Sequence, residues 1–224
     1  ELSGKQGLWL KYINQLLTVW SSILKMSPDT FFRLFFAFLV IAVLGVRFYG
    51  HLKAGSFGSR NRSSYDEGRV TRLLRPLPVL LGIASILYII APELMDWSTL
   101  DLPVWMRLVS IPLGLIAALA MTWVHMTLNK NFSGRLEIRE DHTLITDGPY
   151  RWVRHPMYTA VITLFVAVFL LTANWFIGLV GLVMNVAVIA ARTPKEEAML
   201  VATFGDSYRE YMRRTPRYLP RVFG

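Results

Sequence analysis

The sequence predicts an all-α integral membrane protein. We expect a helical bundle with about five transmembrane helices, an N-terminal interfacial amphipathic helix and a short C-terminal cytoplasmic helical cap. Apolar residues make up 54% of the 224 residues and charged residues only 17%, with a mean hydropathy of +0.41. This is too apolar for an ordinary soluble domain of this length. Long apolar stretches and basic residues gathered in alternate connections support the same class.

The N-terminal segment, residues 7–25, has a helical pattern with one polar and one apolar face. This pattern favours a helix that lies in the membrane interface. A sixth transmembrane helix is the alternative, and Lys11 near its middle argues against it. The polar face carries Lys11, Gln15, Thr18, Ser22 and Lys25, and the apolar face carries Trp9, Ile13, Leu16, Trp20 and Leu24.

Four apolar stretches are candidate spans. They cover residues 30–48, 77–91, 104–128 and 157–191. A single crossing takes about 20 residues, so the last stretch is long enough for two helices. We expect it to break at residues 172–175, which gives five crossings. The stretch 77–91 is the weakest candidate, because it is short and contains Pro78.

Charge gives the expected orientation and organisation. The connections 47–75 and 129–154 and the tail from residue 192 are rich in arginine, whereas the intervening loops are acidic or uncharged. By the positive-inside rule the basic connections and the C-terminus face the cytoplasm, and five spans place the N-terminus outside. We divide the chain into residues 1–29 (amphipathic segment), 30–128 (transmembrane helices 1–3) and 129–224 (C-terminal region: a loop, a transmembrane helical hairpin and the C-terminal cytoplasmic helices).

Composition also excludes several classes of function. The net charge of +9 lies mainly in the short basic connections, so topology and anionic lipids explain it without nucleic acid. The chain has no cysteine, which excludes disulfides, thiolate catalysis and cysteine-ligated metals. Its four histidines lack metal-type spacing, so we expect no metal.

Two polar motifs border the last apolar stretch, at residues 148–158 and 192–197. Because an apolar hairpin separates them, both should lie at the same membrane face. Charged and ring-bearing side chains at a bilayer edge cost free energy unless they are paired, solvated or bound to a ligand. This junction is therefore the candidate site.

The first motif contains a helix start. Pro156 suits the first turn of a helix, so His155 should sit at its entry beside unpaired backbone N–H groups that attract polar groups of a ligand. Tyr150 and Tyr158 offer aromatic surface for a planar base. The structural alternative is that Arg154 and its neighbours anchor the chain in the interface and the rings form an aromatic belt.

The second motif has two interpretations as well. Thr193 to Glu196 form a capping-box pattern with Pro194 at the first helical position, so Glu196 could simply cap a new helix. If the span instead continues helically, Arg192 and Glu196 lie on one face. The arginine could then bind a carboxylate through two hydrogen bonds, and the glutamate could bind a hydroxyl or a cation.

In this order and spacing the motifs resemble the isoprenylcysteine carboxyl methyltransferase family. The resemblance rests on residues 142–150, 154–158, 192–197 and 204–211, and it covers roughly the last 90 residues of the chain. It implies a membrane enzyme that binds S-adenosylmethionine in a cytoplasmic pocket of its C-terminal helices. No Rossmann-type glycine motif is present, which agrees with such a pocket.

Site residues follow from the resemblance, position by position. Arg192 is implied as the substrate-side arginine, and Arg192 and Glu196 are the candidate catalytic pair. The implied cofactor contacts are His142, Thr143, Leu144, Ile145, Tyr150, His155, Pro156, Met157, Tyr158 and Glu196.

The implied acceptor is lipophilic, and we rank the carboxylate of a prenylated-cysteine-like substrate first. Membrane lipids are the other expected partners. Another lipophilic thiol, amine or phospholipid is the alternative, because resemblance does not transfer substrate. An NADPH-dependent reductase of the sterol-reductase type and a non-catalytic scaffold are alternatives of other classes. Polar residues in the spans, such as Arg107, Ser110, His125 and Asn185, could line an acceptor path, but for Arg107 we favour hydrogen bonding between helices or snorkelling.

Overall fold

The computed structural model describes residues 26–53, 73–74, 76–128 and 143–220. The predicted amphipathic helix at residues 7–25 and the implied cofactor residue His142 lie outside these described residues. Within them the chain is helical, with one isolated β-bridge between Thr99 and Asn174. The all-α class predicted from the sequence is therefore confirmed.

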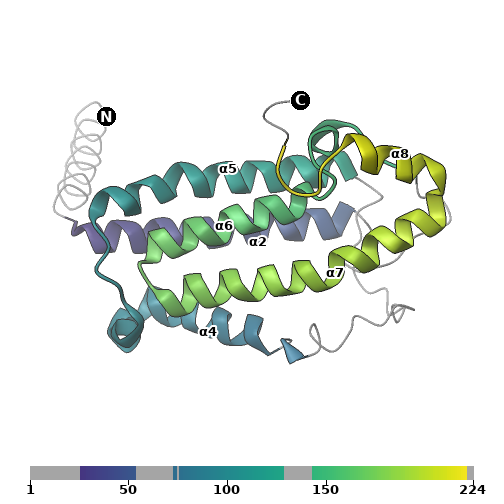
Figure 1. Ribbon diagram of the computed structural model, residues 1–224. Coiled ribbons are helices and arrows are strands. Elements are labelled where there is room, and N and C mark those ends of the chain that lie inside the picture. Colours follow the sequence, from purple (N-terminus) through teal and green to yellow (C-terminus); the bar gives the residue numbers. More distant parts are fainter. Residues whose placement is uncertain (1–25, 54–72, 75, 129–142, 221–224) are drawn as a thin grey trace, which may run out of the picture.

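The long helices lie roughly side by side along one axis (Figure 1). Helix α6 packs against α5, α2 and α7, and the core lies where α2, α5 and α6 meet. The longer helices are α2 (Pro28–Lys53), α4 (Leu77–Ile90), α5 (Val104–Leu128), α6 (Pro156–Thr172), α7 (Gly181–Phe204) and α8 (Asp206–Arg214). Short helical turns are η1 (Pro92–Ser98), η3 (Gly148–Arg151) and η4 (Phe176–Val180).

Three helical stretches among the described residues are long and apolar enough to cross a membrane. They are Pro28–Gly50, Val104–Leu128 and Phe176–Phe204. Helices α4 and α6 are apolar but shorter, and the 14 residues of α4 give a length of only about 21 Å. The structure thus agrees with an integral membrane protein, while the count of five spans stays a prediction.

The predicted break in the last apolar stretch is confirmed. Helix α6 ends at Thr172, and Ala173 adopts a left-handed conformation with φ of 47°. The buried Asn174 side chain accepts a hydrogen bond from the Ile177 amide (3.0 Å) and donates one to the Ser98 hydroxyl (2.7 Å). Together these contacts tie the hairpin turn to η1.

Arg107 bonds between helices, as the favoured interpretation predicted. Its guanidinium pairs with Asp29 of α2 at 2.5 Å and donates to the Leu171 carbonyl of α6 at 3.2 and 3.3 Å. It also lies 4.1 Å from the centre of the Phe32 ring. The cation is buried but fully engaged, which is the condition for a low-cost buried charge.

Helix α7 runs through Pro194 without a break, so the capping-box interpretation of residues 193–196 is wrong. Pro194 cannot donate a backbone hydrogen bond inside the helix. The buried Thr193 hydroxyl donates to the Ile189 carbonyl (2.7 Å) instead of capping a helix start. Arg192 and Glu196 therefore lie one turn apart on the same face of α7.

Gly205 ends α7 and lets the chain turn into α8. Its φ of 56° with ψ of −127° is a conformation that only glycine adopts readily. Tyr208 and Tyr211 form the buried side of the short helix α8, and a cytoplasmic cap at this position stays a prediction.

Candidate functional site

The candidate site lies at the end of the bundle where α6 begins. His155 precedes α6 as its N-cap residue, and Pro156 occupies the first turn, as the sequence predicted. The second motif reaches the same end on α7, and the chain after α8 returns to it (Figure 1). Two sequence motifs and the C-terminal segment thus meet at one place.

The two motifs are in direct contact. The Tyr158 hydroxyl donates a hydrogen bond to Oε2 of Glu196 at 2.7 Å, and His155 Nδ1 lies 3.8 Å from the same oxygen. The rings of His155 and Tyr158 stack, with centroids 5.4 Å apart and an angle of 17° between planes. The pairing of these motifs, expected from the hairpin between them, is confirmed.

Tyr150 and Arg192 belong to the same neighbourhood. Burial raises the pKa of the Tyr150 hydroxyl, and the negative charge of Glu196 raises it further. The positive charge of Arg192 also acts on the Tyr158 hydroxyl. Four residues expected in the site therefore share one electrostatic environment.

Gly148 determines how Tyr150 enters the site. Its φ of 59° suits glycine, and a Cβ at this position would lie only 3.0 Å from the Thr127 hydroxyl of α5. The turn that follows forms η3, and the Tyr211 hydroxyl of α8 donates to the Tyr150 carbonyl at 2.6 Å.

Glu197 is the residue that the sequence interpretation missed. Its buried carboxylate accepts hydrogen bonds from Arg154 (2.8 and 3.1 Å) and from Arg217 (2.7 Å), and it lies 3.3 Å from His155 Nε2. Arg154 is thus a partner of Glu197, and the interpretation of this arginine as an interface anchor is wrong. The available signal was the pair of adjacent glutamates opposite an arginine-rich motif.

The C-terminal segment covers the helix entry. The backbone amides of Arg154 and His155 donate to the carbonyls of Pro216 (2.8 Å) and Arg217 (3.0 Å). The Tyr218 hydroxyl bonds the Thr193 hydroxyl at 2.6 Å. These two amides are therefore paired within the protein and are not available to a ligand.

His155 is held neutral by its surroundings. Burial lowers the pKa of its imidazole, and this effect exceeds the opposing influence of Glu196 and Glu197. A neutral ring has one donor and one acceptor nitrogen, which suits a residue placed between two carboxylates and an aromatic ring.

The remaining implied cofactor residues have mixed surroundings. Thr143, Leu144 and Ile145 precede η3 without regular secondary structure, and Thr143 is exposed. Met157 packs against the hydrophobic core of α2, α5 and α6, so its side chain contributes to the fold. In the described ranges no three His, Asp or Glu side chains are placed to hold a metal ion.

Comparison with known proteins adds an independent observation. Residues 110–202 match the model of the isoprenylcysteine carboxyl methyltransferase (ICMT) family. The protein-S-isoprenylcysteine O-methyltransferase of Schizosaccharomyces pombe is 35% identical over 83 residues, which cover 37% of this chain and 35% of that protein. The Rattus norvegicus enzyme of the same name is 27% identical over 130 residues, 57% of this chain and 46% of that protein.

A solved structure shares the fold. It is the eukaryotic intramembrane Ras methyltransferase ICMT, which superposes with a TM-score of 0.52 at 21% identity over 66% of this chain and 53% of that one. The matches thus span about half or less of the length of these relatives. The family that residues 110–202 match is the one that the motifs in the sequence indicated.

Proposed function

We propose that this protein is a membrane methyltransferase that moves a methyl group from S-adenosylmethionine to the carboxylate of a prenylated-cysteine-like acceptor. The observation that carries the proposal is the hydrogen bond between Tyr158 and Glu196, which joins the two family motifs beside Arg192. The family match of residues 110–202 and the names of the relatives support it. The basic connections support a cytoplasmic site and a cytoplasmic C-terminus.

The chemistry of the side chains fits S-adenosylmethionine, which supplies a methyl group activated by a positively charged sulfur. The Glu196 side chain is 30% exposed, and its Oε1 accepts no hydrogen bond from the described residues. This oxygen is available to a ligand hydroxyl or ammonium group. His155, Tyr158 and Tyr150 would add aromatic surface for a planar base, and residues 143–145 would add backbone polar groups.

We assign the acceptor side to Arg192. A guanidinium binds a carboxylate through two parallel hydrogen bonds, so it would fix both the position and the orientation of the acceptor. An ionised carboxylate is already nucleophilic, and no general base is required. The protein therefore contributes alignment of the two reactants and exclusion of water.

The two reactants would reach the site by different routes. Many large apolar side chains are exposed on the helices, including Leu34, Ile83, Leu119 and Val183, as expected for contact with lipid. A prenyl chain could therefore approach from the bilayer. The polar methyl donor would arrive from the aqueous phase at the end where α6 begins.

The test is a methyl-transfer assay with purified protein and S-adenosylmethionine labelled in its methyl group. N-acetyl-S-farnesylcysteine is the acceptor, and its carboxamide is the matched control. The proposal predicts a methyl ester on the acid and no product with the amide. Methyl transfer to a prenyl thiol, an amine or a phospholipid but not to the acid would show that the proposed acceptor is wrong. Oxidation of NADPH without methyl transfer would show that the protein is a reductase.

A further inference from the structure

A cavity lies at the end of the bundle opposite the candidate functional site. It has a volume of about 650 Å³ and is bordered by the first turns of α2 and α5, the ends of α4 and α6, and η1. Figure 1 shows these segments together at the end away from α8. Pockets for small molecules typically have volumes of roughly 300–1,000 Å³. The proposed methyl transfer makes no use of this cavity.

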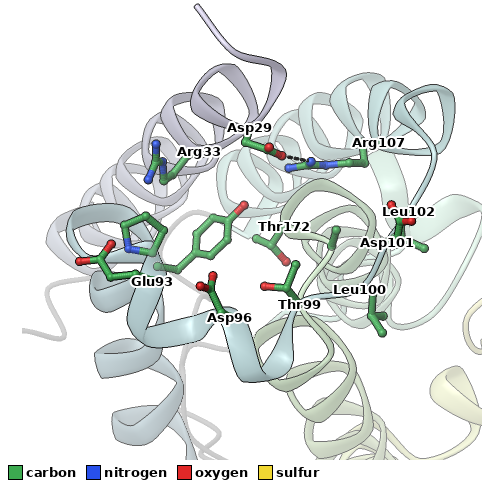
Figure 2. A pocket seen from close by; sticks show the side chains of 13 residues that line it. Asp29, Arg33, Glu93, Asp96, Thr99, Leu100, Asp101, Leu102, Arg107 and Thr172 are labelled. Carbon is green, nitrogen blue, oxygen red and sulfur yellow. Dashed lines mark hydrogen bonds and ion pairs between the residues drawn. The ribbon is translucent and has the colours of Figure 1, made fainter.

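Basic side chains line one side of the cavity and acidic side chains the facing side. Figure 2 shows Arg33 and the Asp29–Arg107 pair opposite Glu93 and Asp96. Arg107 is committed to Asp29 and to the Leu171 carbonyl. Arg33 donates to the Thr30 hydroxyl at 3.2 Å and forms no ion pair within the described residues. One guanidinium is therefore available to an anion.

The acidic side lacks a cation. Three acidic residues of the lining form no ion pair with any side chain in the described part of the chain: Glu93, Asp96 and Asp101. With Asp29 the lining has four acidic residues and two arginines, an excess of two negative charges. The side chains around them are not arranged as a metal site. A ligand that carries both a phosphate and an ammonium group matches this separation of charge.

The surroundings point to a lipid as the source of such a ligand. Trp97 and Trp175 pack edge to face at 5.5 Å near this end, as expected for the aromatic belt of a membrane interface. Large apolar side chains close to the lining residues in sequence are exposed. The exposed fractions are 57% for Leu34 of α2 and 72% for Ile90 of α4. These side chains would contact acyl chains while the head group occupies the cavity.

We propose that this cavity binds the head group of an ethanolamine phospholipid, with the phosphate at Arg33 and the ammonium at Asp96 and Glu93. A primary ammonium has three N–H donors for carboxylates. Quaternary ammonium groups are instead recognised by aromatic cages, and the acidic side of this cavity is made of carboxylates. The proposal does not depend on the methyl-transfer function.

The experiment measures lipid binding to the delipidated full chain in detergent by native mass spectrometry. The probes are dioleoyl phosphatidylethanolamine, phosphatidylcholine and phosphatidylglycerol, with soluble phosphoethanolamine as competitor. The test variants are Arg33→Gln and Asp96→Asn, since Arg107 also holds helices together. The controls are Arg209→Gln and Asp206→Asn, an exposed ion pair on α8 at the other end.

We expect the ethanolamine lipid to bind about tenfold more tightly than the other two, which corresponds to about 1.4 kcal/mol. Each test variant should lose about tenfold in affinity for it, while the control variants bind as the wild type does. Equal binding of all three lipids, or unchanged binding by both test variants, would overturn the proposal. If phosphoethanolamine binds as tightly as the lipid, the ligand is not specifically a lipid. If the three lipids bind equally and the protein binds calcium, and Asp96→Asn loses the calcium, the cavity is a cation site instead.

Discussion

The Tyr158 hydroxyl donates a 2.7 Å hydrogen bond to Oε2 of Glu196, across 38 positions of sequence. The bond links the first turn of α6 to the C-terminal half of α7. The charge pattern predicts that this half lies on the cytoplasmic side. Because the acceptor is ionised, a bond of this kind contributes about 1.5–3 kcal/mol. It occupies Oε2 of the carboxylate and leaves Oε1 for a ligand. The proposed methyl-donor site is built on this pair.

Arg192→Ala should abolish methyl transfer while leaving methyl-donor binding nearly intact. The proposed role of this arginine is to orient the acceptor carboxylate, so its loss should lower kcat/KM at least about 100-fold, a transition-state effect of about 2.7 kcal/mol. Arg192→Lys should recover only part of the activity, because a lysine cannot form two parallel hydrogen bonds. Turnover kinetics and calorimetric titration with S-adenosylhomocysteine measure the two effects separately.

The control for Arg192 is Arg47→Ala, an exposed arginine of α2. We expect wild-type kinetics from this variant. Normal turnover in Arg192→Ala, or an equal loss in both variants, contradicts the assignment of the acceptor carboxylate to Arg192.

Glu197→Gln should destabilise the fold. The change removes the buried negative charge between Arg154 and Arg217, and loss of one partner from a buried ion pair costs about 3–5 kcal/mol. Arg217 is half exposed, so water compensates part of its loss and the lower end applies. The apparent melting temperature in detergent measures the effect. Glu210→Gln, on the surface of α8, should change it little, and similar values for both variants would exclude a structural role for Glu197.

Stability should fall as the pH drops below about 6.5, the ordinary pKa of histidine. Burial lowers the pKa of His155, so the unfolded chain takes up a proton there at a pH where the folded protein does not. This contribution is fully present above the unfolded pKa and is lost as the pH falls toward the folded pKa. Melting temperatures at pH 7.5 and 5.5 test it. His155→Asn should show a smaller difference between the two pH values, and an equal difference would rule out His155 as the source.

The predicted five crossings would place α8 and η1 on opposite sides of the membrane. The chain has no cysteine, so single cysteines report position without background. In intact cells, a membrane-impermeant maleimide should label Asp101→Cys and should label Arg209→Cys only after the membrane is opened. Labelling of both positions from the same side would contradict the predicted topology.

The helices could be predicted because their signals are local. Apolar length gave α2 and α5, and the polar break at residues 172–175 gave the hairpin, where Asn174 provides the turn with its own hydrogen bonds. Pro194 shows the limit of such signals. Residues 193–196 suit either a helix start or a helix interior. The burial of Thr193 and its contact with Tyr218 favour the helix interior.

The site could be predicted only in part, because much of it depends on contacts distant in sequence. Motif order gave Tyr158 and Glu196, which the structure brings together. Nothing local shows that Glu197 would be enclosed by Arg154 and Arg217, or that the backbone of residues 216–217 would pair with the helix entry. Both depend on how the chain folds back after α8.

The most direct test of the account is calorimetric titration of the detergent-purified protein with S-adenosylhomocysteine, the expected product. Wild-type protein should bind it, and the affinity of Glu196→Ala should be lower by a factor of about ten or more. Tyr158→Phe should also bind it more weakly, because this variant loses the hydrogen bond that orients the Glu196 carboxylate. Glu210→Ala should bind as the wild type does. Folded wild-type protein that binds no S-adenosylhomocysteine, or equal binding by wild type and Glu196→Ala, would contradict the proposed methyl-donor site.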